Sequence, residues 1–245
     1  MSPIQQILLG TPAPSSGGGN VDIENNGLIA YWNAISANVQ NQSSNSKILD
    51  TSGSGNHLNS ATSSMTWEAS DGGRVIVPSG GSNYMEYDST ITFNGGTAWT
   101  YFWCGRKLVT SSGWWMMATN NDGDNFIGIY DNYLHRLDSN NNIKGDLSLS
   151  NISYATNTIH CFYVTMKTDG NMTWFHNGST LGSVTFGDGT NVWAADSAVF
   201  KFIDRYSGTS LHSEGRFYFS GFYDRDLSSS EVSSNWSAHQ TRLGI

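Results

Sequence analysis

The amino-acid sequence predicts an all-β sandwich with one short C-terminal helix, and three observations support this fold class. From His160 to Met166, successive residues alternate between two faces of an extended chain, as in a β-strand. The dipeptide Asn177-Gly178 follows a second such run and tolerates the positive φ angles of a tight hairpin turn. Aromatic and charged residues each make up 13% of the 245 residues, and glycine is abundant, which is typical of many short strands joined by turns.

The same alternation assigns side chains to faces. We expect Phe162 and Val164 on one face of their strand, and Cys161 and Tyr163 on the other. Further strands are predicted at Leu28–Ala34, within Gly72–Tyr87, at Trp99–Leu108, at Trp114–Ala118 and within Phe126–Leu137.

The last strand is predicted at Gly215–Tyr223. Strict alternation places Phe217 and Phe219 on the face opposite Tyr218 and Phe222.

A short helix is predicted after the last strand. Ser228 and Glu231 have the spacing of a capping box, in which the serine side chain and the glutamate side chain each bond a backbone amide of the other. Leu227 lies where a hydrophobic staple begins, with Val232 as its partner. We therefore expect a helix at residues 229–239.

Several segments resemble laminin-G-like domains with a concanavalin A-like fold. Lys47–Ser60 (KILDTSGSGNHLNS) is similar to the family pattern D-x-S-G-x-G-N-H, and Trp99–Leu108 is similar to its aromatic strand. Gly80–Met85 resembles the family's G-S-N-D-Y-I segment. The resemblance covers about residues 27–245 and implies a two-sheet antiparallel jelly roll. In the loop, Asp50 is expected to accept hydrogen bonds from nearby backbone amides, as in an Asx-turn.

The first 26 residues have a different composition. Residues 1–10 form a short mixed arm with the apolar side chains Ile4, Ile7, Leu8 and Leu9, and residues 11–26 are rich in Pro, Gly, Ser and Asn, as linkers are. The arm lacks the basic start and long apolar run of a signal peptide. We expect a docking arm and linker at 1–26 and a sandwich domain at 27–245. The alternative interpretation is a frayed terminus.

The two ends of the chain, MSPIQQILLG and TRLGI, resemble structural proteins of tailed phages. This resemblance implies a virion protein that is made in the host cytoplasm. Its arm would dock on the major capsid protein or another virion protein, and the sandwich would decorate or stabilise the capsid. A tail or tail-fibre component and a free carbohydrate-binding lectin are the alternatives.

Charge and hydropathy exclude two classes of partner. The net charge is −8 and no cluster of Lys and Arg is present, which disfavours nucleic acid. No apolar run approaches the roughly 18 residues that cross a bilayer, so we expect no membrane insertion.

The sequence also predicts a non-enzymatic protein. Glycosidases of this fold place carboxylates at alternate positions of one strand, because retaining hydrolysis needs two carboxyl groups about 5–5.5 Å apart. Glu86 and Asp88 have such a spacing but lack a third member. No G-x-S-x-G elbow is present either.

One loop is a candidate site for a structural calcium ion. Asp122, Asp124 and Asn125 form a dense set of oxygen donors, which Ca²⁺ prefers. The alternative interpretation is a solvated hairpin loop. Asp50 and Asn56 are a second hypothesis for the ion.

Exposed aromatic residues next to Asn and Asp are typical of carbohydrate sites. The glycan-binding hypothesis covers two clusters, which consist of Trp114, Trp115, Tyr130, Asp131, Asn132 and Tyr133. Adjacent strand residues point in opposite directions, so one of the two tryptophans is expected to face outward. The alternative is that these rings fill the core or a contact between copies in a homo-oligomer.

The two cysteines, Cys104 and Cys161, each lie within a predicted strand. We expect buried thiols that pack as small apolar groups. A disulfide stays open as an alternative if the two strands are neighbours.

Overall fold

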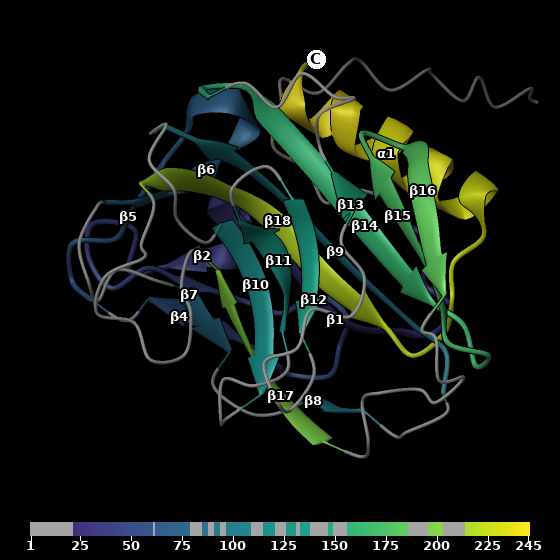
Figure 1. Ribbon diagram of the computed structural model, residues 1–245. Coiled ribbons are helices and arrows are strands. Elements are labelled where there is room, and N and C mark those ends of the chain that lie inside the picture. Colours follow the sequence, from purple (N-terminus) through teal and green to yellow (C-terminus); the bar gives the residue numbers. More distant parts are fainter. Residues whose placement is uncertain are drawn as a thin grey trace, which may run out of the picture.

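The computed structural model describes residues 22–60, 62–78, 85–87, 91–93, 97–108, 115–120, 126–130, 133–137, 147–148, 156–185, 196–202 and 214–245. Within these residues the fold is a two-sheet antiparallel sandwich with one C-terminal helix, α1 (Ser229–Leu243), as the sequence predicts (Figure 1).

Sheet A contains the long strands of the domain. Its order along the sheet is β16 (Ser179–Thr185), β15 (Asn171–His176), β14 (Ile159–Met166), β9 (Trp99–Lys107), β18 (Gly215–Tyr223), β6 (Arg74–Val77) and β5 (Thr66–Glu68), with β1 (Leu28–Asn33) also paired to β18.

Sheet B faces sheet A. Its order is β13 (Leu147–Ser148), β12 (Tyr133–Leu137), β11 (Phe126–Tyr130), β10 (Trp115–Asn120), β17 (Asp196–Phe202), β7 (Met85–Tyr87), β4 (Leu58–Ser60), β3 (Lys47–Ile48) and β2 (Val39–Gln40), with β8 (Ile91–Phe93) also paired to β17. Two short 3-10 turns, η1 (Ser36–Asn38) and η2 (Ser70–Gly72), lie in the connections.

The central strands of sheet A, β14, β9 and β18, are largely buried on both faces, which the sequence did not predict. Every residue of β14 is buried. Phe162 and Val164 belong to one core cluster, whereas Cys161 and Tyr163 belong to a second cluster that also contains Trp236 of α1. The predicted alternation is therefore confirmed, and α1 covers the outer face of the sheet, the one that carries Cys161 and Tyr163.

Residues 22–26 lie beside α1 on this outer face. The side chain of Ile23 is buried in the second cluster, and the backbone amide of Glu24 donates to Oδ1 of Asn235 at 2.9 Å. The hydroxyl of Tyr223 donates to the carbonyl of Glu24 at 2.8 Å. The last five residues of the segment predicted as a linker thus pack against the domain.

The predicted alternation in β18 is wrong from Phe219 onward, since Phe219 lies in the cluster of Tyr218 and Phe222 lies in the cluster of Phe217. A bulge separates Phe217, which pairs with Gly105, from Phe219, which pairs with Cys104. The extra residue is Tyr218, so Tyr218 and Phe219 both contribute to the outer cluster. Sequence alternation alone does not reveal such an insertion, because it depends on the register with β9.

Local turn and cap signals are confirmed. Asn177 and Gly178 have φ angles of 47° and 76°, as the hairpin between β15 and β16 requires. Helix α1 begins with the predicted capping box of Ser228 and Glu231. It extends four residues beyond the predicted end and stops at Gly244, whose φ of 72° is left-handed.

Cys104 and Cys161 are directly opposed across β9 and β14, and both are buried free thiols. The expectation of buried thiols is confirmed. Burial raises the pKa of Cys161, and the neighbouring Cys104 thiol raises it further, so the thiol form persists at neutral pH.

Candidate functional site

The residues of the glycan-binding hypothesis are partly brought together at one end of sheet B. Tyr130 closes β11 and Tyr133 opens β12, and the two are paired directly across the ladder. Trp115 opens β10 and pairs with Ile129, one position before Tyr130. Trp114, Asp131 and Asn132 lie outside the described residues. The backbone therefore brings these three positions to the same end of three adjacent strands, and only Tyr130 and Tyr133 among them are directly paired.

The predicted calcium loop also lies outside the described residues, since Asp122, Asp124 and Asn125 fall between β10 and β11. The described ranges contain no group of three or more His, Cys, Asp or Glu side chains arranged to hold a metal ion. The calcium site at 122–125 stays a prediction. The docking arm with Ile4, Ile7, Leu8 and Leu9 likewise lies outside the described ranges.

Asp50 organises the rim loop as an Asx-turn and does not suit a cation. Its Oδ1 accepts from the backbone amides of Tyr31 and Ser52, both at 2.9 Å. Its Oδ2 accepts from the hydroxyl of Ser52 at 2.9 Å and from the amide of Asn56 at 3.0 Å. Four donors occupy the roughly four acceptor positions of the carboxylate, so it lacks the free lone pairs that a calcium ligand needs.

The rest of the loop is anchored in the same way. The side-chain amide of Asn56 donates through Nδ2 to the carbonyl of Ile29 at 2.9 Å, and the indole of Trp32 donates to the carbonyl of Asn56. His57 accepts from the backbone amide of Asp50 at its Nδ1, at 3.1 Å. The exposed residues of the loop are Thr51 and the tip from Gly53 to Gly55.

An arginine and carboxylate cluster on the outer face of sheet A was missed by the sequence analysis. Arg74 on β6 binds Glu68 and Asp71, and Arg106 on β9 binds Asp71 at 3.0 Å. Tyr218 donates its hydroxyl to Oδ2 of Asp71 at 2.7 Å. Burial raises the pKa of Tyr218, and its hydrogen bond to Asp71 raises it further, so it acts as a neutral donor.

The cluster forms a structural network. Arg216 on β18 adds a third guanidinium, 3.6 Å from Glu68 and 3.8 Å from Glu214. Among the described residues of this cluster, three carboxylates thus balance three arginines. Asp71 and Arg74 are three residues apart, but Arg106 and Arg216 join the cluster only through the pairing of β6, β9 and β18.

Two histidines form a second unpredicted pair. Nδ1 of His160 lies 2.9 Å from Nε2 of His176, and their rings are stacked with centroids 5.1 Å apart. Burial, together with the neighbouring His160, lowers the pKa of His176 to about 4. His176 is therefore neutral at pH 7 and serves as one partner of a hydrogen bond between imidazoles.

The described residues carry no arrangement of paired catalytic carboxylates. Glu68 and Asp71 are both bound by Arg74. Glu86 lies on β7 opposite Asn59 and Lys201, and its expected companion Asp88 lies outside the described ranges.

Among the described helices, none is long and apolar enough to cross a bilayer.

Comparisons with known proteins identify the fold. No protein-family model and no curated protein sequence matches the chain. Among solved structures, the binding domain of botulinum neurotoxin serotype G matches with a TM-score of 0.65 and 16% identity over 87% of this chain and 51% of that chain. The binding domain of Paraclostridial Mosquitocidal Protein 1 matches with a TM-score of 0.64 and 16% identity, over 87% of this chain and 52% of that chain.

The ligand binding domain of botulinum neurotoxin serotype D, solved in complex with N-acetylneuraminic acid, matches with a TM-score of 0.62 and 14% identity, over 87% of this chain and 51% of that one. The chain spans about half the length of each matched structure. At these identities the likeness shows the fold alone. The protein thus has the concanavalin A-like sandwich of toxin binding domains.

Proposed function

We propose that this protein is a non-catalytic carbohydrate-binding module, and that its site lies at the end of sheet B where β10, β11 and β12 meet. The observation that carries the proposal is the direct pairing of Tyr130 with Tyr133. Opposed residues of an antiparallel ladder have Cα atoms about 4.5–5.5 Å apart, so the pairing brings the backbone positions of the two tyrosines within this distance. Tyrosine combines a flat apolar ring with a hydroxyl, which suits the apolar faces and hydroxyl groups of a sugar.

Two further points support this function. Asp131 and Asn132 stand between the two tyrosines in the sequence and would supply hydrogen bonds to sugar hydroxyls. The matched structures are binding domains, and one of them holds N-acetylneuraminic acid. For another matched protein, botulinum neurotoxin type C, cell entry depends on interaction with two ganglioside molecules.

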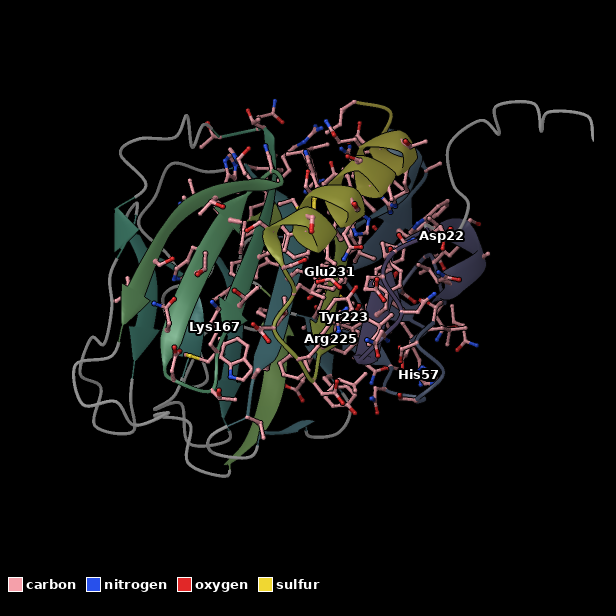
Figure 2. The ribbon with its side chains drawn as sticks, turned by 90° about the vertical axis from the view of Figure 1, so that its right-hand side faces the viewer. Asp22, His57, Lys167, Tyr223, Arg225 and Glu231 are labelled. Carbon is pink, nitrogen blue, oxygen red and sulfur yellow. The ribbon has the colours of Figure 1, made fainter. Side chains whose placement is uncertain are left out.

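The test is a glycan array probed with the full-length protein, followed by calorimetric titration of the best glycan and of N-acetylneuraminic acid. We expect the Tyr130→Ala/Tyr133→Ala variant to bind at least tenfold more weakly. Lys167→Ala is the matched control, because Lys167 is exposed in a turn of sheet A (Figure 2). Absence of glycan binding, or equal binding by both variants, would contradict the proposal.

Removing residues 1–20 separates this function from a role on a particle. Glycan binding should survive the deletion, because the proposed site lies in the sandwich. The virion role and its arm stay a prediction, since neither the described residues nor the matched structures bear on them.

A further inference from the structure

His239 is buried in the centre of the interface between α1 and sheet A. Its ring is stacked on Phe219 of β18, with centroids 3.7 Å apart and an angle of 12° between the planes. The rings of Tyr31 on β1 and Phe102 on β9 each lie 6.0 Å away. Neither ring nitrogen of His239 has a hydrogen-bond partner among the described residues. The neutral imidazole therefore packs here as an aromatic ring.

A buried positive charge lies beside it. Arg242 follows three residues later on α1 and is 4% exposed. Its Nε donates to Oδ1 of Asn33 at 2.8 Å, and its Nη2 donates to the carbonyl of Gly73 at 2.7 Å and to that of Tyr218 at 3.4 Å. All of these acceptors are neutral. The guanidinium is thus held by hydrogen bonds and not by an ion pair within the described residues.

No anion among the described residues compensates a second charge at this place. Burial raises the pKa of Tyr31 on β1 and of Cys161 and Tyr163 on β14. The remaining titratable or charged groups packed around His239 and Arg242 are the Cys104 thiol on β9, Tyr218 and Tyr223 on β18, and Asp71 in η2. Asp71 is already bound by Arg74, Arg106 and Tyr218, and burial raises the pKa of both tyrosines.

Protonation of His239 would therefore oppose the docking of α1. Burial lowers the pKa of His239 well below its ordinary value, and the charge of Arg242 lowers it further. A histidine with a depressed folded-state pKa contributes stability that is complete above the unfolded pKa of about 6.5 and is lost as the pH falls below it. Each pH unit below about 6.5 favours the undocked state roughly tenfold, because undocking takes up one proton.

Helix α1 also holds the start of the domain in place. Glu24 is bound through Asn235 of α1 and Tyr223, and Asn235 in turn donates to the Tyr223 hydroxyl at 3.0 Å. Nη2 of Arg225 lies 2.7 Å from Oε1 of Glu231 and 3.7 Å from Oε1 of Glu24. Arg225 and Glu231 are labelled in Figure 2, beside the N-terminal end of α1. Undocking of α1 would thus also free residues 22–26 and expose the aromatic outer face of sheet A.

We propose that His239 is a protonation-controlled latch, which keeps α1 and residues 22–26 docked on sheet A at neutral pH and releases them at acidic pH. Undocking of α1 can be measured by the reactivity of the two buried thiols beneath it. Cys104 and Cys161 belong to the cluster that α1 covers, so they become reactive only when α1 undocks. The thiol reagent 4,4′-dithiodipyridine forms a mixed disulfide with the cysteine and releases 4-thiopyridone, which is measured by its ultraviolet absorbance.

Labelling is followed on the full-length protein from pH 8 to pH 4.5, and each rate is divided by the rate for the urea-unfolded chain at the same pH. We expect this relative rate to rise about tenfold for each pH unit below about 6.5. In His239→Phe, which keeps a ring on Phe219 but takes up no proton, the relative rate should be independent of pH. His239→Gln gives the same comparison if the phenylalanine variant does not fold at pH 8.

The control is His176→Phe, because His176 also has a lowered pKa but its ring packs on Phe162, which belongs to the core cluster on the other face of sheet A. Its labelling should follow that of the wild-type protein. The proposal is overturned if the relative labelling rate of the wild-type protein does not change with pH, or if both His239 variants keep the wild-type slope. It is also overturned if the near-ultraviolet circular dichroism is lost over the same pH range as the labelling increases, because that would show global unfolding. The assay does not involve sugar, so its outcome is independent of the proposed glycan function.

Discussion

The indole of Trp236 on α1 packs directly on Gly178, the second residue of the turn between β15 and β16. A Cβ atom at Gly178 would lie 2.6 Å from Cδ1 of Trp236. The hairpin turn, which the sequence alone predicts, therefore also forms part of the surface on which the C-terminal helix packs. The left-handed conformation at Gly178 and the docking of α1 thus depend on the same residue.

Gly178→Ala should destabilise the protein for two reasons, backbone strain and collision with Trp236. The φ of 76° disfavours alanine by about 1 kcal/mol, and the collision adds roughly 1–3 kcal/mol of overpacking. Gly55 is the matched control, because its φ is 77° but a Cβ added there would have no other atom within 4 Å. Urea unfolding of both alanine variants measures the difference. Equal losses at the two positions would show that Trp236 does not press on the turn.

Ser228→Ala should cost about 1 kcal/mol of stability. The Ser228 side chain accepts from the backbone amide of Glu231, and Glu231 accepts from the amide of Ser228 at 2.7 Å. Ser234→Ala is the control, since Ser234 lies exposed inside the same helix and alanine is the better helix former. Thermal or urea unfolding that ranked the two variants in the opposite order would exclude a stabilising capping box.

Glu231 should contribute to the loss of unfolding free energy at acidic pH. Its hydrogen bond to Arg225, with further bonds from Ser228, lowers its pKa to about 2. A carboxylate with a depressed folded-state pKa stabilises the fold above its ordinary pKa of 4.5, and this stability is lost as the pH falls towards 2. In Glu231→Gln the loss of stability between pH 4.5 and 2 should be shallower than in wild type. An equal slope in Glu231→Gln and in the wild-type protein would contradict this contribution.

Asp50→Ala should loosen the rim loop and cost roughly 2–3 kcal/mol, because four donors lose a charged acceptor together. Asp169→Ala is the control, since Asp169 accepts from one amide, that of Asn171, in an exposed turn. Hydrogen exchange of residues 51–57 should rise selectively in the Asp50 variant. A loss no larger than that of the control would mean that the loop is held by its other contacts.

Calcium should raise the melting temperature through the loop at 122–125. We expect EDTA to lower the Tm of the wild-type protein and to leave that of Asp122→Asn/Asp124→Asn unchanged, because the variant lacks two carboxylate ligands. An identical wild-type Tm with calcium and with EDTA would end the hypothesis.

The sequence by itself determined the features that depend on residues close together in the chain. The alternation in β14, the left-handed angles at Asn177 and Gly178, and the cap at Ser228 are all decided within a few residues. These local signals were enough for the fold class, since a two-sheet sandwich follows from many short amphipathic strands.

Only the tertiary structure decided which surfaces are covered and which charges meet. Asn33 binds Arg242 across 209 residues, and Glu24 binds Asn235 across 211 residues. The bulge at Tyr218 depends on its register with β9, and the burial of His239 depends on where α1 docks. Such contacts have no signature in local sequence, because the free energy that selects them comes from burial and pairing between segments that meet only in the folded chain.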